Sequence, residues 1–413
     1  MHREVCAYKV DLEWITVRGL PTWQCARKVA ARNPDGKRQI VKKRIVYLVP
    51  GFFGFSHLGG LNYFRGVTKN LCAALEERGY VTEVVGCATQ PTGSIPRRSA
   101  RLLARVVETG GLEAEALHFV GHSTGGLDTR LLLTPGATVG HSGREREIAA
   151  RTRSVVTIST PHHGTPLAAF FTTVHGRRLL LLLATMASSP QGRVSLYLAG
   201  RLMALVARAD DFMGRTDTLL DNVSRRMLND LSPERQHAVW EYLRDIAGDQ
   251  GAILQLTPEA MHLYNAATAD APGIAYGSIL SGTPQPPFAY RPSDFNSARG
   301  ILMTAVFSFM HTLASRQHVH YPYPDLPEDM RSDIEAKLGA PVTSRTNDAV
   351  VPTMSQLHGE LLHTALGDHL DVVGQFKDPD DPLTNWLPSG SRFEAKDFRA
   401  VWHTVAEHIT THG

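Results

Sequence analysis

The chain has 413 residues, enough to bury a large core in one big domain with an insertion or in two domains. Its charged fraction of 20% is that of an ordinary globular protein, and its formal net charge of only +3 singles out no nucleic-acid partner. The sequence contains no run of about 18 apolar residues, so no transmembrane helix is predicted.

Short apolar runs alternate with amphipathic segments from residue 44 onward. Five runs have the composition of buried strands, and helical patterns cover 61–78, 97–109 and 126–133. This alternation predicts an α/β protein with a mostly parallel sheet covered by helices on both faces. The five predicted strands are 44–50, 81–86, 116–121, 154–159 and 274–280.

Two regions lie outside the predicted core of 44–165 and 274–413. Residues 1–43 are predicted to be an N-terminal extension, and 166–273 a mainly helical insertion. The insertion is either a set of core helices or a cap over an apolar substrate site. Residues 283–340 are rich in Pro and Tyr and predict a loop-rich excursion, whereas the apolar spacing after Phe398 predicts a packed final helix.

The stretch ALHFVGHSTGGLDTRLLL places Ser123 in a G-x-S-x-G pattern between a strand and a helix. A serine at such a turn is exposed at the carboxyl end of the strand, where it can act as a nucleophile. Gly121 and Gly125 allow close approach of the neighbouring backbone. The sequence therefore predicts a nucleophilic Ser123 rather than a structural turn.

A nucleophilic serine needs two N–H donors for the oxyanion of its tetrahedral intermediate. One is the backbone N–H of Thr124, the residue after the nucleophile. The second is predicted to be that of Phe52, because the strand in RIVYLVPGFFGF ends at Pro50-Gly51. Phe52, together with Phe53 and Phe55, also predicts an apolar wall near the site.

The acid and the base should follow the serine in that order along the chain. Asp348, in the polar turn SRTNDAVVP, is the clearest acid. Of the three histidines that come next, His358, His363 and His369, the last is favoured because GDHLDVV is a polar turn. The stretch between Asp348 and His369 leaves room for a helix. His369 would then accept the serine proton, and Asp348 would fix its tautomer.

These motifs resemble those of bacterial true lipases of the Pseudomonas and Burkholderia type. The resemblance rests on VPGFFGFSHLGGLNYFRGV, FVGHSTGGLDTR, SVVTISTPHHGTPLA, TNDAVVP and DHLDVVGQF, in that order. It implies an α/β-hydrolase fold with lid helices after TPHHGTP. It also implies a serine esterase or lipase in which Ser123, Asp348 and His369 form the catalytic triad and Phe52 and Thr124 the oxyanion hole.

The resemblance further implies a structural calcium ion beside the histidine loop. Asp371 and Gln375 match two of the family's calcium ligands. The alternative interpretation is that Asp371 is an ordinary acid at the start of a helix. Calcium usually takes a second carboxylate. Residues that could supply it are Asp325, Glu328 and Asp329, among which the sequence does not choose.

The chain departs from the family at several points. Pro50-Gly51 replaces its usual His-Gly, and the later half lacks its cysteine pair; Cys6, Cys25, Cys72 and Cys87 are predicted to be buried free thiols. No signal peptide is visible, which predicts a cytoplasmic protein unless another export route exists.

We expect a serine hydrolase of carboxylic esters, a triacylglycerol lipase or a carboxylesterase, that needs no cofactor for its chemistry. The substrate would be a small ester or a lipid, with transient contact to a lipid interface through the cap. An acyltransferase, a polyester depolymerase, a peptidase or amidase, and a catalytically silent binding protein remain alternatives.

Overall fold

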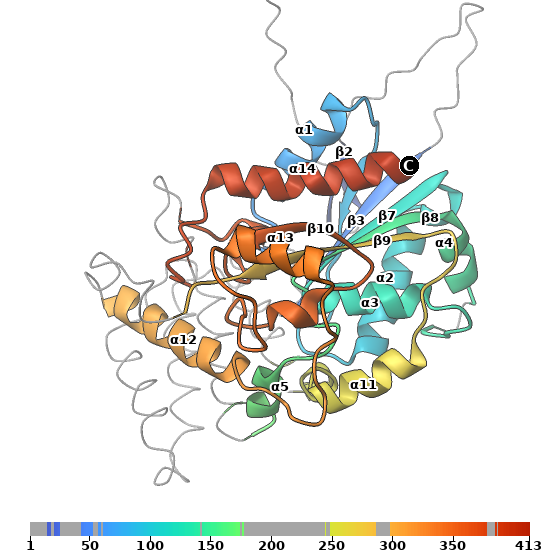
Figure 1. Ribbon diagram of the computed structural model, residues 1–413. Helices are drawn as coiled ribbons and strands as arrows, with labels where there is room; N and C mark the ends of the chain where they lie inside the picture. The colour runs from blue at the N-terminus through green and yellow to red at the C-terminus, as the bar shows by residue number, and fades with distance from the viewer. Residues whose placement is uncertain are drawn as a thin grey trace, which may run out of the picture.

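The computed structural model describes most of the chain, and the element labels below are those of Figure 1. Phe53, Phe55 and most of the predicted cap lie outside the described residues, so the predictions made for them stay predictions. The described residues are 15–17, 20–24, 43–52, 57–58, 61–140, 143–173, 248–285, 298–377 and 387–413, with the single residues 176, 244 and 385.

A sheet of eight strands forms the centre of the described structure, in the order β1-β2-β6-β3-β7-β8-β9-β10. From β6 to β10 every neighbouring pair is parallel, whereas β2 runs antiparallel to both β1 and β6. The strands are β1 (Ile15–Val17), β2 (Leu20–Gln24), β3 (Arg44–Val49), β6 (Glu83–Gly86), β7 (Ala116–His122), β8 (Thr152–Ile158), β9 (Ala275–Gly282) and β10 (Glu360–Leu366). A separate two-stranded pairing joins β4 (His57–Leu58) and β5 (Leu61–Asn62).

All five predicted strands are confirmed, as β3, β6, β7, β8 and β9. Their continuous apolar runs fit strands buried on both faces: every residue of β7 is buried. The sequence analysis missed β10, and it missed β1 and β2, which lie inside the predicted N-terminal extension.

Helices cover both faces of the sheet, as Figure 1 shows. On one face lie α1 (Val67–Glu77) and the predicted final helix α14 (Ala395–His412), with Trp402 fully buried between strand and helix side chains. On the other face lie α2 (Ile95–Glu108), α3 (Thr124–Leu133) and α4 (Glu145–Arg151). There Leu102, Leu132 and Ile148 pack against Tyr47 and Phe119 of the sheet.

The parallel sheet, the helices on both faces and the turn from β7 through Ser123 into α3 together make an α/β-hydrolase fold. At the two ends of the predicted cap, the structure has α5 (Pro166–Phe171), α10 (Gly251–Gln255) and α11 (Pro258–Ala267). The residues between them are largely outside the described part, so a lid over the site stays a prediction.

The predicted loop-rich excursion over 283–340 is wrong in its centre. The structure has α12 (Ala298–Ala314) and α13 (Glu328–Leu338) there, because ARGILMTAVFSFMHTLA and EDMRSDIEAKL contain no Pro and few strong helix breakers. The Pro-rich flanks had suggested loops throughout. The space between Asp348 and His369 likewise holds the short 3-10 helix η3 (Thr353–Gln356) and β10, not an α-helix.

The prediction that all four cysteines are free thiols is wrong. Cys87 is a buried free thiol, whereas Cys72 on α1 forms a disulfide whose partner lies outside the described residues. Among the helices that the structure describes, we find none with the length and apolar character needed to cross a membrane.

Candidate active site

Ser123 occupies a strained turn between β7 and α3. Its φ of 55° and ψ of −130° are uncommon for a residue with a side chain, and it is the N-cap of α3. A hydrogen bond of 2.9 Å from its N–H to the carbonyl of Ile158 ties this backbone to the end of β8. Strain held in this way by surrounding structure is typical of functional sites.

The glycines on both sides of Ser123 are required by close backbone contacts. A Cβ placed on Gly121 would lie 2.5 Å from the nitrogen of Gly126, and one on Gly125 would lie 2.2 Å from the carbonyl oxygen of Val49. Any side chain at either position would therefore push α3 away from β7 or β3. This close packing holds the serine at the carboxyl end of the central strands.

The structure brings together Asp348 and His369, which the sequence predicted as acid and base. The Nδ1 of His369 lies 2.8 Å from Oδ2 of Asp348, and the N–H of His369 donates to the Asp348 carbonyl at 3.0 Å. Both residues are buried. With its Nδ1 proton held by the carboxylate, His369 presents Nε2 as the basic nitrogen.

The Asp348 carboxylate is saturated with hydrogen-bond donors. Oδ1 accepts from the N–H groups of Val350 and Val351, at 3.0 and 2.7 Å. Besides His369, Oδ2 accepts from the hydroxyl of Ser281 at 2.7 Å and from the side-chain amide of Gln356 at 3.2 Å. These donors fix the orientation of the carboxylate toward His369.

His369 lies beside the serine turn. Its carbonyl bonds to Nε2 of His122, the residue before Ser123, at 2.9 Å, and the two imidazole rings are 4.7 Å apart between centroids. The two rival histidines lie elsewhere. His358 pairs with Asp270 at 2.9 Å, and His363 is a partly buried residue of β10.

The predicted oxyanion loop lies directly against Ser123. A Cβ added to Gly51 would lie only 2.4 Å from the Cβ of Ser123. The guanidinium of Arg98 donates to the carbonyls of Pro50 and Gly51, at 2.8 and 3.1 Å. Because carbonyl and N–H point in opposite directions in a trans peptide, this clamp on Gly51 turns the N–H of Phe52 away from Arg98.

Arg98 is itself held by a buried ion pair. Its guanidinium lies 2.8 Å from Oδ2 of Asp128 on α3, and neither side chain is exposed. Burial raises the pKa of Asp128 to about 6, and the charge and hydrogen bonds of Arg98 oppose that shift. A buried pair of this kind adds little net stability, but it is costly to break, so it fixes the geometry of the loop.

Thr124, the other predicted oxyanion residue, is the first residue of α3 and is fully buried. Its N–H belongs to the first turn, whose N–H groups have no partner within the helix and lie at the positive end of the helix dipole. Both predicted donors are therefore in segments that adjoin Ser123.

His122 connects the loops around the serine, a role that the sequence analysis did not predict. Tyr63 Oη lies 2.6 Å from His122 Nδ1 and accepts the N–H of Gly51 at 2.9 Å. His122 Nε2 lies 2.9 Å from the carbonyl of His369. One chain of hydrogen bonds thus runs from the oxyanion loop to the histidine loop. Burial, together with the nearby His369, lowers the pKa of His122 well below its ordinary value.

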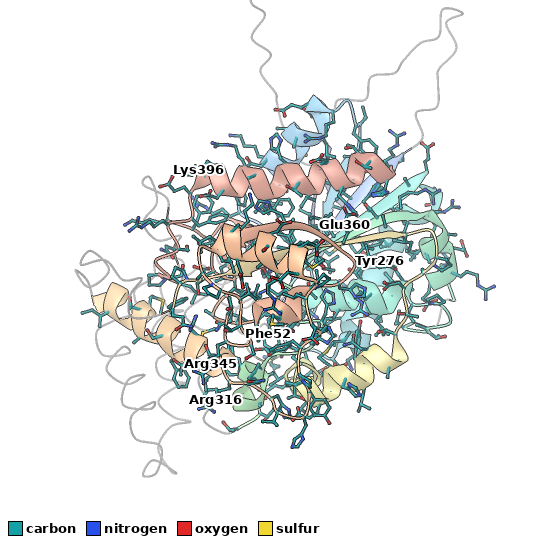
Figure 2. All side chains as sticks on the ribbon, in the orientation of Figure 1. Phe52, Tyr276, Arg316, Arg345, Glu360 and Lys396 are labelled. Carbon is teal, nitrogen blue, oxygen red and sulfur yellow. The ribbon has the colours of Figure 1, made fainter. Side chains whose placement is uncertain are left out.

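An apolar cluster lies on the α5 side of the site. Phe52 packs against Leu127, Ala168, Leu256 and Met261, which come from α3 and from both ends of the predicted cap region. Figure 2 shows Phe52 close to α5. The side of the site that faces α5 is therefore apolar.

Asp371, a predicted calcium ligand, lies in a buried carboxylate pair with Asp368. Oδ2 of Asp371 accepts from the N–H of Asp368 at 2.9 Å and from the hydroxyl of Ser391 at 3.0 Å. Burial raises the pKa of Asp368 to about 7, and burial and the Asp368 charge raise that of Asp371 well above its ordinary value. Oδ2 of Asp368 is buried and has no hydrogen-bond partner among the described residues.

The two carboxylates offer oxygen atoms of the kind that bind calcium. Gln375, which follows a few residues later in the sequence, is also buried. The three acids considered as the second carboxylate, Asp325, Glu328 and Asp329, are all exposed. The carboxylate beside Asp371 is instead Asp368, which the sequence analysis overlooked. Its position directly before His369 was the available signal.

No family model and no curated protein sequence matches this chain. Among solved structures, it is similar to a metagenomic carboxyl esterase, with 17% identity over 93% of this chain and 82% of that one and a TM-score of 0.48. Lipase 1 from Pelosinus fermentans has 19% identity over 89% and 99%, with a TM-score of 0.49. Staphylococcus hyicus lipase has 18% identity over 92% and 98%, with a TM-score of 0.47. The fold assignment rests on the sheet order and the serine turn, not on these similarities.

Proposed function

We propose that this protein is a serine hydrolase that cleaves carboxylic esters, with Ser123 as nucleophile, His369 as base and Asp348 as orienting acid. The observation that carries the proposal is the 2.8 Å contact between His369 and Asp348, located beside a strained serine at a strand-to-helix turn. A structural turn requires neither the strain nor the buried acid–histidine pair.

The mechanism follows from this arrangement. His369 Nε2 takes the proton of the Ser123 hydroxyl as Oγ attacks the ester carbonyl, and the N–H groups of Phe52 and Thr124 stabilise the oxyanion. The tetrahedral intermediate then releases the alcohol, which takes its proton from His369. Water, deprotonated by His369, hydrolyses the acyl-enzyme, and Ser123 regains its proton.

The finer proposal is a lipase or carboxylesterase with an apolar acyl pocket. The apolar cluster around Phe52 supports a hydrocarbon acyl group, and the similar solved structures are named as lipases and a carboxyl esterase. Hydrolysis rates for a chain-length series of p-nitrophenyl and glycerol esters distinguish the two activities. A lipase prefers long acyl chains and a substrate interface, whereas a short-chain esterase does not.

A calcium ion at Asp371 and Gln375, with Asp368 as the second carboxylate, forms a further part of the proposal. Two buried carboxylates repel each other unless a proton or a cation neutralises them. Oδ2 of Asp368, which has no hydrogen-bond partner among the described residues, is an oxygen atom that the ion would bind. The ion would hold the loop that carries His369 and would take no part in the chemistry.

The Cys72 disulfide bears on the cell compartment. Disulfides persist in oxidising compartments and are rare in the cytosol. We therefore infer that the protein works in an oxidising compartment, which departs from the cytoplasmic location predicted from the N-terminus.

Replacement of the nucleophile tests the proposed chemistry. Ser123→Ala should abolish ester hydrolysis and labelling by a fluorophosphonate, while circular dichroism and melting temperature stay close to wild type. Ser332→Ala, at an exposed position on α13, is the matched control and should keep full activity and labelling. Substantial esterase activity in Ser123→Ala would refute the assignment.

A further inference from the structure

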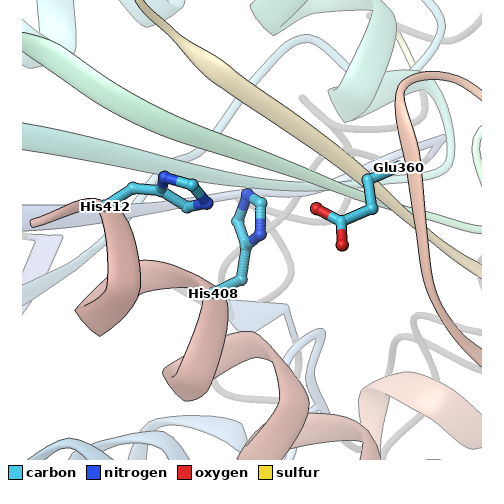
Figure 3. A group of neighbouring side chains, drawn as sticks. All are labelled: Glu360, His408 and His412. Carbon is cyan, nitrogen blue, oxygen red and sulfur yellow. The ribbon is translucent and has the colours of Figure 1, made fainter.

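A second group of chemically capable side chains lies outside the active site, where α14 passes the beginning of β10. Glu360 opens β10, and His408 and His412 lie near the end of α14. One potential ligand atom from each residue lies within 4.8 Å of the others. Figure 3 shows the ring of His408 between His412 and Glu360.

The helix places the two histidines for joint binding. Residues four apart lie on the same face of an α-helix, the spacing by which two histidines can bind one metal ion. The ring centroids of His408 and His412 are 4.7 Å apart. Glu360 comes from a different element, so a bound ion would connect the helix to the strand.

The surroundings of His408 favour a metal-binding form of its ring. Its side chain is buried, and Nε2 lies 3.4 Å from the carbonyl of Ala275 on β9. When Nε2 carries the proton and donates to this carbonyl, the lone pair of Nδ1 is left to bind a metal ion, an arrangement typical of metal-binding histidines.

We propose that Glu360, His408 and His412 bind a divalent transition-metal ion of the Zn²⁺ class, with water as the remaining ligand. Two imidazole nitrogens and one carboxylate are ligands that Zn²⁺ prefers, whereas Ca²⁺ takes oxygen ligands. The site is separate from the carboxylate pair of Asp368 and Asp371.

The ion would act as a structural clip. β10 is the last strand in the sheet order, so one of its edges has no strand neighbour in the described structure. Glu360 is at its amino end, whereas His369 follows its carboxyl end. Because the core strands are parallel, the metal site lies at the amino ends of the strands, whereas Ser123 lies at their carboxyl ends. Metal binding should therefore stabilise the fold without changing ester hydrolysis.

The test uses full-length, untagged protein stripped of metal by a chelator. Zn²⁺ binding is measured by calorimetric titration and by the melting temperature, and Co²⁺ is used as a spectroscopic probe of nitrogen ligands. His412→Ala and Glu360→Gln change exposed residues and should leave the apo-protein folded. His403→Ala is the matched control, because His403 lies on the same helix but faces Glu77 at 3.9 Å.

We expect one equivalent of Zn²⁺ to bind and to raise the melting temperature, and excess chelator to reverse that rise. Loss of a residue that only hydrogen-bonds to a metal ligand typically weakens metal binding by about 10–100-fold. Loss of a direct ligand in His412→Ala or Glu360→Gln should therefore weaken Zn²⁺ binding at least tenfold. His403→Ala should bind like wild type. The proposal is overturned if the wild-type protein shows no saturable binding, or if all three variants bind alike.

Discussion

The hydroxyl of Tyr63 joins the oxyanion loop to His122, and its removal should therefore reduce both stability and turnover. Tyr63→Phe keeps the ring but deletes the oxygen that accepts from Gly51 N–H at 2.9 Å and bonds His122 Nδ1 at 2.6 Å. Tyr63 and His122 are both buried, so solvent cannot easily replace the missing partner.

The magnitude follows from the two groups left behind. A buried polar group without a partner costs about 1–3 kcal/mol, so with two such groups the free energy of unfolding should fall by about 2–6 kcal/mol. Removing one oxyanion donor outright costs about 10²–10³ in kcat. Tyr63→Phe only loosens the loop that presents Phe52 N–H, and we expect kcat to fall by about tenfold, with KM little changed.

Tyr47→Phe is the matched control. Tyr47 is also a buried tyrosine, and its hydroxyl bonds Thr109 Oγ1 at 2.7 Å, on α2's side of the sheet and away from the serine turn. Urea unfolding and steady-state hydrolysis of a p-nitrophenyl ester measure both effects. Both variants should lose stability, but only Tyr63→Phe should lose kcat. Equal kcat in the two variants would refute the positioning role of Tyr63.

The remaining predictions concern the acid, the buried histidines, calcium and the disulfide. Asp348→Asn should lower kcat by about 10⁴ while the protein stays folded, because the amide no longer holds His369 in the right tautomer; single-turnover kinetics would measure this, and a loss below tenfold would contradict it. His118, His122 and His162 are buried with lowered pKa values, so they stay neutral in the folded state and take up protons on unfolding below pH 6.5. Their contribution to stability is then present above pH 6.5 and lost as pH falls, by about 1.4 kcal/mol per histidine at pH 5.5. The buried carboxyls with raised pKa values act in the opposite direction over this range, so the test compares variants: the prediction is disproved if His118→Asn leaves the difference between the denaturant midpoints at pH 7.5 and pH 5.5 unchanged. A calcium chelator should lower the melting temperature, and Asp371→Asn should remove that response; a chelator without effect on the wild type counts against the calcium site. Alkylation under denaturing, non-reducing conditions should label fewer than four thiols, and all four after reduction, if Cys72 is disulfide-bonded in the purified protein.

Local patterns in the sequence predicted the parts of the site that depend on neighbouring residues. The turn around Ser123 needs a strand before it, a helix after it and glycines where backbones meet, and all of these lie within one short stretch. Asp348 and His369 could be predicted because chain order reduced the possibilities. The structure then distinguished His369 from His358 by placing the latter against Asp270.

Contacts between distant segments could not be predicted in this way. Arg98 is an ordinary basic residue of an amphipathic helix by its pattern, yet it is buried and holds the carbonyls of Pro50 and Gly51. Asp368 was overlooked because its burial beside Asp371 depends on the fold of the loop and on Ser391. Helices α12 and α13 were missed because Pro-rich flanks dominated the composition of their region.

The contacts of His122 argue against this histidine, the neighbour of Ser123, as the base of the proposed mechanism. Its Nε2 faces a carbonyl oxygen and must therefore carry the proton. Nδ1 of the neutral ring then has only a lone pair, so it accepts a hydrogen bond from the Tyr63 hydroxyl, whose oxygen accepts from the N–H of Gly51. Both nitrogens are thus committed in one neutral tautomer, and burial disfavours a second proton. Among the described residues, the partner of the His369 ring is Asp348 at Nδ1, so in the proposed mechanism Nε2 is the nitrogen that takes and returns the proton. In the proposed mechanism the two neighbouring rings therefore have different roles: His122 holds the loops in place, and His369 transfers the proton.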